Sequence, residues 1–129
     1  TGTTCSVDVT FPSNPWDRTS IAAYTVDTAS MASTTPVDSK FLDSASASTM
    51  TVNLSTLSGG FVIATAANRN ISANSATWSG VSERYDFATA GIVSSGGDAS
   101  ATPTSTSAYP VTVTYLNAQA MSMLAISYR

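Results

Sequence analysis

The chain has 129 residues, of which 43% are hydrophobic and only 10% are charged, and its net charge is −3. Because disordered chains pair high net charge with few apolar residues, this composition favours one folded domain that buries about two thirds of its unfolded surface. The five basic residues are scattered, which argues against nucleic-acid binding, and no apolar stretch approaches the ~20 residues of a membrane-spanning helix.

The beginning of the chain lacks the features of a secretory signal. It starts Thr1-Gly2-Thr3-Thr4, without Met, a basic region or an apolar run, and leads directly into an alternating pattern. We therefore expect residues 1–129 to form a single domain, either matured or the C-terminal part of a longer polypeptide. Cys5 is the only cysteine, which rules out an intramolecular disulfide, and its place in the alternation predicts a small buried core residue rather than a reactive thiol.

Alternation of apolar and polar residues, which is typical of half-buried strands, recurs along the whole chain. In chain order it predicts strands over residues 5–11, 20–26, 50–54, 61–67, 76–78, 82–88, 91–95, 111–115 and 120–128. The strand over 61–67 is apolar on both faces and is therefore expected at the centre of a sheet. The strand over 120–128 has the same character, so it should be central or covered.

Segments rich in Ser, Thr, Ala and Gly are predicted to connect these strands. The longest covers residues 27–47, with a short strand near Phe41 and Leu42, and only residues 38–47 offer room for a turn or two of helix. Gly96-Gly97-Asp98 predicts a turn or bulge, and residues 99–108 predict a loop.

Eight to nine short strands joined in this way favour an all-β fold, an antiparallel β-sandwich. A jelly-roll-like sandwich is favoured over an immunoglobulin-like one, because the Cys…Trp…Cys pattern of true immunoglobulin domains is missing.

Catalytic machinery is hard to assemble from these residues. The sequence contains no histidine, which removes the commonest general base and the usual zinc ligand. Glu83 and Asp86 are the nearest pair of carboxylates, yet positions three apart on an extended strand point to opposite faces about 10 Å apart. We therefore predict no enzymatic activity and no cofactor. Calcium is the weaker alternative, since no closely spaced run of aspartates supplies its oxygen ligands.

The segment 78–86, WSGVSERYD, concentrates aromatic and charged residues in a chain that is otherwise poor in both. In the structural interpretation Trp78 is buried between sheets, Gly80 permits a bend, and the charged residues form a surface ladder. Alternation places Val81, Glu83, Tyr85 and Phe87 on one face and Ser82, Arg84 and Asp86 on the other, where Arg84 pairs with Asp86 or with a charge on a neighbouring strand. In the functional interpretation the segment is an exposed edge that holds another subunit or a glycan. The candidate interface or ligand-binding residues are Trp16, Trp78, Arg84, Tyr85 and Asp86.

The string Trp78-Ser79-Gly80-Val81-Ser82-Glu83-Arg84-Tyr85-Asp86 resembles a pattern, W-S/T-G-L/V-S/T-E-x-Y/F-D, of proteins from tailed phages and prophage regions. Residues 59–64, 7–11 and 18–24 are similar to that group as well. Its members usually carry further β-rich sequence before this region. The resemblance implies an accessory virion component: a capsid decoration, head-fibre or tail-associated domain. It brings no functional residues with it, because the group has no assigned chemistry.

Taken with that resemblance, the sequence predicts a non-enzymatic virion structural protein, a capsid decoration (cement) or fibre-like module on the virion surface. Its expected partners are other virion proteins, namely the major capsid or tail protein, and further copies of itself; nucleic acid and membranes are not expected. The alternative is a carbohydrate- or receptor-binding module of a tail or surface adhesin, with a glycan as partner. A bacterial surface or filament subunit is a third reading with the same architecture.

Overall fold

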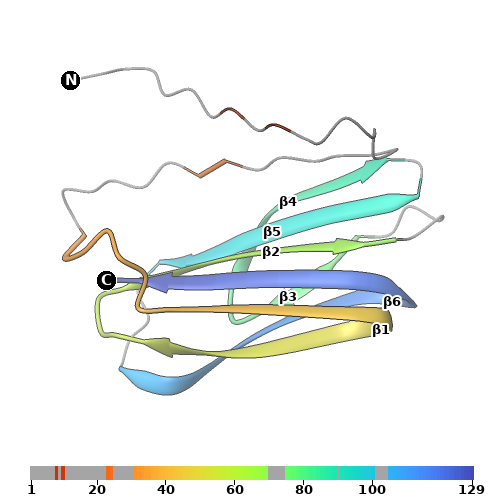
Figure 1. Ribbon diagram of the computed structural model, residues 1–129. Helices are drawn as coiled ribbons and strands as arrows, with labels where there is room; N and C mark the ends of the chain where they lie inside the picture. The colour runs from red at the N-terminus through yellow and green to blue at the C-terminus, as the bar shows by residue number, and fades with distance from the viewer. Residues whose placement is uncertain are drawn as a thin grey trace.

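The computed structural model describes residues 8, 10, 23–24, 31–69, 75–89, 91–100 and 105–129. These residues form six strands (Figure 1): β1 (Asp38–Thr56), β2 (Phe61–Asn68), β3 (Thr77–Ser79), β4 (Ser82–Thr89), β5 (Ile92–Ser100) and β6 (Thr106–Tyr128). Every strand pairing is antiparallel. In the described part of the chain, no helix is long and apolar enough to cross a membrane.

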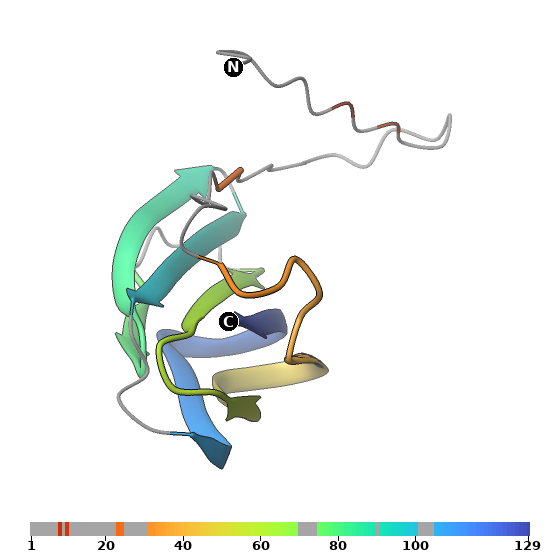
Figure 2. The ribbon, with the colours of Figure 1, turned by 90° about the vertical axis from the view of Figure 1, so that its left-hand side faces the viewer.

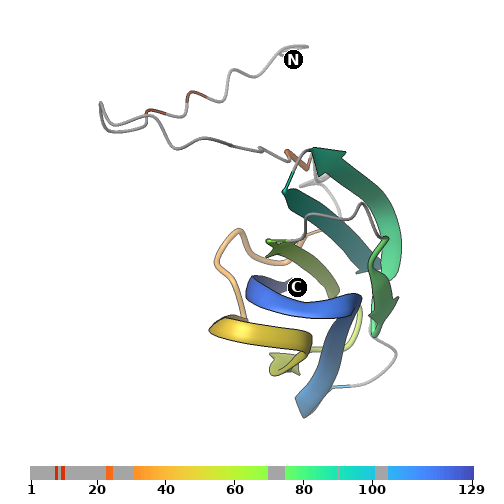
Figure 3. The ribbon, with the colours of Figure 1, turned by 90° about the vertical axis from the view of Figure 1, so that its right-hand side faces the viewer.

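The sheet folds over on itself because its two longest strands bend together. Residues 38–44 of β1 pair with residues 121–127 of β6, and after register shifts around Ala47, residues 49–56 pair with the first part of β6. The second part of β6 also pairs with β2, and β5 and β4 follow β2 in the sheet. The first part of β6 pairs with β3. Two facing layers result, joined by β1 and β6, and the curvature of both strands is visible in Figures 2 and 3.

The core lies between the two layers and follows the period-2 alternation of each strand. Its buried side chains come from β1 (Met50, Val52, Leu54), β2 (Val62, Ala64, Ala66), the first part of β6 (Val111, Val113, Tyr115) and the second part of β6 (Met121, Met123, Ala125). The predicted all-β, antiparallel sandwich is therefore confirmed. The first described strand pairs with the last and the second with the fifth, as in the outer pairs of a jelly roll, whereas β3 pairs with β6 and not with β4.

Polar groups close the sandwich where the two ends of β1 meet. The hydroxyl of Ser127, which is fully buried, donates to the carbonyl oxygen of Ser55 at 2.7 Å. The backbone N–H of Ser55 donates to Oδ2 of Asp38 at 2.9 Å. This hydrogen bond is the main reason why the pKa of Asp38 lies below its usual value, since it stabilises the charged carboxylate.

Several predicted connections are strand instead. Residues 38–47, predicted as connection or helical turn with a short strand only near Phe41 and Leu42, belong to β1 throughout, and the two strands predicted over 111–115 and 120–128 are one strand, β6. Both regions are extended because they pair with each other along almost their whole length. The predictions for residues 5–11 and 20–26, and for Cys5, lie outside the residues that can be assessed, since only four scattered positions there are described.

Of the turn or bulge predicted at Gly96-Gly97-Asp98, the turn is wrong, because β5 continues through it to Ser100. A bulge does occur at this place, but its extra residue is on β4, opposite Gly96 and Gly97. Glycine is needed there for space rather than for a bend. A Cβ on Gly96 would overlap the ring of Tyr85, and one on Gly97 would lie 2.5 Å from the carbonyl oxygen of Ser82. The glycines thus let β4 and the Tyr85 ring pack closely against β5.

Candidate functional site

Trp78 joins the two layers of the sandwich. The side chain is half-buried and packs against the core, and its Nε1–H donates to Oγ of Ser95 at 2.7 Å. The Ser95 hydroxyl donates in turn to the carbonyl oxygen of Tyr85 at 3.1 Å. β3 in one layer is thereby linked to β5 and β4 in the other.

A bulge at Arg84 changes which side chains share a face. Glu83 is opposite Gly97 and Tyr85 is opposite Gly96, so Arg84 is an extra residue with no partner of its own in the register. Beyond this point the alternation is shifted by one. The prediction that Glu83 and Asp86 point to opposite faces, and that Glu83 shares a face with Tyr85, is therefore wrong.

Glu83 and Asp86 interact directly as a result. The pKa of Glu83 is raised, first by burial of its carboxyl group and then by the charge of Asp86 and a hydrogen bond with it. Asp86 also accepts a hydrogen bond from the backbone N–H of Ala76 at 3.0 Å, which fastens β4 to the segment before β3.

Replacing Asp86 with asparagine is expected to lower the pKa of Glu83. The amide still accepts from Ala76 but carries no charge, so the repulsion that favours protonated Glu83 is lost. Because the pKa of Glu83 is raised in the folded protein, its contribution to stability is present below the unfolded-state pKa and is lost as pH rises through the folded-state pKa. Asp86→Asn should weaken this pH dependence of stability. The ¹³C shift of the Glu83 carboxyl group, followed against pH, measures the change. Asp43→Asn, on β1, is the control, and an unchanged Glu83 midpoint in Asp86→Asn would show that the pair does not interact.

Arg84 forms an ion pair across the strands rather than with Asp86. Its Nε–H donates to Oδ2 of Asp98 at 2.7 Å and its Nη2–H donates to Oδ1 at 2.8 Å. Of the two pairings expected for Arg84, the one with a neighbouring strand is thus observed. The bulge explains this choice, because Arg84 leaves the face of Asp86 and reaches β5.

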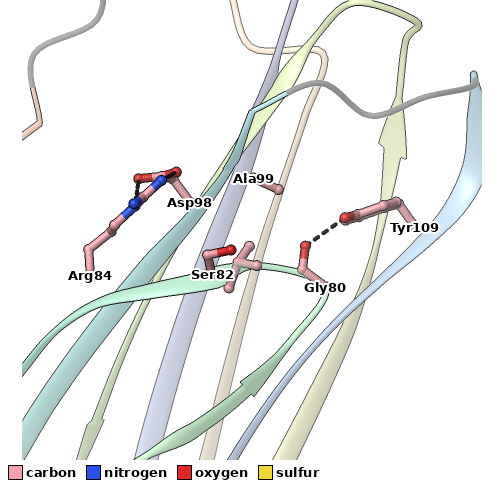
Figure 4. A pocket seen from close by; sticks show the side chains of 7 residues that line it. Gly80, Ser82, Arg84, Asp98, Ala99 and Tyr109 are labelled. Atoms are coloured by element: carbon pink, nitrogen blue, oxygen red, sulfur yellow. Dashed lines mark hydrogen bonds and ion pairs between the residues drawn. The ribbon is translucent and has the colours of Figure 1, made fainter.

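This ion pair lines a pocket at one end of the sandwich (Figure 4). The pocket has a volume of about 360 Å³, and its wall is formed by Gly80, Val81, Ser82, Arg84, Asp98, Ala99 and Tyr109. The hydroxyl of Tyr109 donates to the carbonyl oxygen of Gly80 at 2.6 Å, which ties the start of β6 to the turn between β3 and β4. Figure 4 shows the Tyr109–Gly80 bond and the Arg84–Asp98 pair on opposite sides of Ser82 and Ala99.

The candidate residues from the sequence are only partly brought together. Trp78, Tyr85 and Asp86 lie around the joint between β3, β4 and β5, Arg84 lies at the pocket, and Trp16 falls outside the described residues. Asp98 was missed because it fell in a predicted turn or bulge, and Tyr109 because it lies between the predicted loop over 99–108 and the predicted strand over 111–115. The one signal for Asp98 in the sequence is its acidic side chain, which could pair with Arg84 from a neighbouring strand. That the two residues are neighbours follows only once β4 and β5 are paired.

A second surface is apolar and exposed. We name it the apolar face: it consists of the outward side chains Phe41, Ile63, Leu124 and Ile126, together with Phe61 and Tyr128, whose rings stack with centroids 5.2 Å apart. The register places Phe41 beside Leu124 and Ile126 beside Ile63, so the side chains are contiguous over β1, β6 and β2. Phe41 is 65% exposed and Leu124 is 37% exposed.

The outer face of the other layer is hydroxylic. Thr49 and Thr51 on β1 form side-chain hydrogen bonds of 3.1 and 2.8 Å with Thr114 and Thr112 on β6. The two outer faces of the sandwich therefore differ in chemistry: among the described residues, the hydroxylic face presents one large exposed apolar side chain, Leu116, whereas the apolar face presents several that adjoin one another.

In comparisons with known proteins, no family model, curated protein or solved structure matches the chain. Among the residues that the structure describes, no group of three or more Asp, Glu, His or Cys side chains is arranged to hold a metal ion.

Proposed function

We propose that the chain is a non-enzymatic structural protein of a virion, a capsid decoration or fibre-like module, and that its apolar face packs against a second copy of the chain. The observation that carries the packing is the contiguous row of outward apolar side chains in which Phe41 and Leu124 are exposed and their neighbours are half-buried. The assignment to a virion is supported by the resemblance of residues 78–86 to phage accessory proteins.

The apolar face has the chemistry of a permanent interface. Asp43, at its margin, is the one charged residue among the outward positions of the paired segments 38–44, 61–68 and 121–128. Burying this surface therefore removes few charges from water, and contiguous apolar surface of this kind marks interaction sites in soluble proteins. Interfaces between identical subunits are more apolar than transient ones, so a second copy suits this face better than a charged partner.

Pairing through the sheet edge is the less favourable mode of assembly. β1 pairs with β6 alone in the described part of the chain, so its other side is an edge. Lys40 and Asp38 form an ion pair of 3.3 Å on this strand, and charged side chains on an edge oppose pairing with another chain. The face is consequently the better surface for self-association.

Quantitative mass spectrometry of purified phage particles tests the proposal. We expect the chain in fixed stoichiometry with the major shell protein, and a loss of copies from particles that carry Phe41→Ser. Leu116→Ser is the matched control, because Leu116 is also strongly exposed, at 76%, but lies outside the apolar face. Absence of the wild-type chain from particles, or equal incorporation of both variants, would overturn the proposal.

A further inference from the structure

We propose that the pocket lined by Arg84, Asp98 and Tyr109 binds one ring of a neutral saccharide. This site goes beyond the structural role, because it lies at the end of β4 and β5 and shares no residue with the apolar face. Its volume of about 360 Å³ falls within the ~300–1,000 Å³ of ligand pockets. The charge balance of the pocket, its spare hydrogen-bonding groups and its rigidity favour such a ligand.

The charge balance selects a neutral ligand. Arg84 is the cation of the lining and Asp98 is its anion, and they neutralise each other through two short hydrogen bonds. A phosphate or carboxylate ligand would have to compete with Asp98 for the guanidinium group. An ammonium ligand would likewise compete with Arg84. A polar ligand without charge binds beside the pair and leaves it intact.

The spare hydrogen-bonding groups match hydroxyl groups. A guanidinium group has five N–H donors and a carboxylate accepts about four hydrogen bonds, and the pair itself uses two of each. The side chains remain accessible, at 54% for Arg84 and 25% for Asp98. A hydroxyl group both accepts and donates, so one sugar hydroxyl can accept from Arg84 while it donates to Asp98. Ser82, opposite Asp98 in the register, adds a further hydroxyl.

The rest of the lining is held in place and adds a small apolar area to a mostly polar pocket. Val81 and Ala99 contribute aliphatic surface, and the half-buried ring of Tyr109 is fixed by its hydrogen bond to Gly80. A pyranose ring presents C–H groups between its hydroxyls, and these suit such a surface. Because the ion pair and the tyrosine are already ordered, binding immobilises few protein side chains and loses little entropy.

Titration of the ¹⁵N-labelled chain with neutral methyl glycosides and short neutral oligosaccharides, followed by NMR, tests the proposal. We expect at least one of them to shift the amide signals of Ser82, Arg84 and Asp98 in a saturable way at millimolar concentration. Inorganic phosphate is expected to leave these signals in place. No saturable shift with any neutral sugar, or a stronger response to phosphate, would overturn the inference.

Substitutions at the pocket separate binding from folding. Asp98→Asn and Arg84→Lys each break the bidentate pair and are expected to weaken sugar binding about tenfold, which corresponds to about 1.4 kcal/mol. Asp43→Asn removes an equal charge outside the pocket and should bind like the wild type. Each spectrum also reports whether the variant is folded, so Arg84→Lys decides the question if Asp98→Asn does not fold. Wild-type affinity in a folded pocket variant would contradict the site, whereas the packing of the apolar face would be unaffected by that result.

Discussion

Replacing Gly80 with alanine is expected to lower the free energy of unfolding by about 3 kcal/mol, from backbone strain of ~1–2 kcal/mol and overpacking of ~1–3 kcal/mol. Gly80 has a φ of 86° and forms the turn between β3 and β4. A Cβ at this position would collide with the carbonyl oxygen of Pro110. Pro110 cannot retreat easily, because it lies within β6 opposite Asn53. Urea denaturation followed by circular dichroism measures the loss.

Gly59 provides a matched control for the strain alone. Its φ is 78°, close to that of Gly80, but a Cβ there would meet no atom within 4 Å. Gly59→Ala should therefore cost only about 1 kcal/mol. Equal losses in the two variants would mean that the contact between the turn and Pro110 is not as close as described.

Trp78→Ala is expected to destabilise the fold by about 3 kcal/mol, since it removes part of the core and one buried hydrogen bond. The indole spans the space between β3 and Ser95 on the opposite layer, and no other described side chain is hydrogen-bonded to Ser95 Oγ. Trp78→Phe keeps most of the apolar contact and should lose less, about 1–2 kcal/mol. Thermal and urea unfolding of both variants measure these losses.

Phe87→Ala is the comparison for Trp78, because Phe87 is an aromatic residue of the same region that is 56% exposed. Its truncation is expected to change stability by no more than about 0.5 kcal/mol, as is usual for surface positions. A Trp78→Ala variant as stable as Phe87→Ala would show that Trp78 is not part of the joint between layers. That result would favour the interpretation of Trp78 as an exposed binding residue.

The sequence predicts the core well wherever one face of a strand is buried. Met50, Val52 and Leu54 alternate with polar residues and are all buried, and the same holds for Val111 and Val113. Alternation records burial directly, because successive side chains of a strand point to opposite faces. The architecture could be predicted for the same reason, as no segment has the period of a helix.

Features that depend on pairing between distant strands could not be predicted. Ser, Thr and Ala in residues 38–47 favour a loop locally, yet this segment is strand because it lies beside residues 119–127. The bulge at Arg84 arises from the fit of β4 to β5, and it reverses the faces of the β4 residues from Tyr85 onward. The same holds for the site. Arg84 is recognisable as a candidate in the sequence, whereas its pairing with Asp98 depends on the register between β4 and β5.

Packing of the apolar face against a second copy can be observed by nuclear Overhauser effects between copies. In a sample that mixes isotope-labelled and unlabelled chains, only contacts between different molecules are selected. We expect intermolecular signals between the methyl groups of Leu124 or Ile126 and the ring of Phe41, because these side chains form the surface that the second copy would cover. No intermolecular signal, or signals confined to Thr112 and Thr114 on the opposite face, would contradict it.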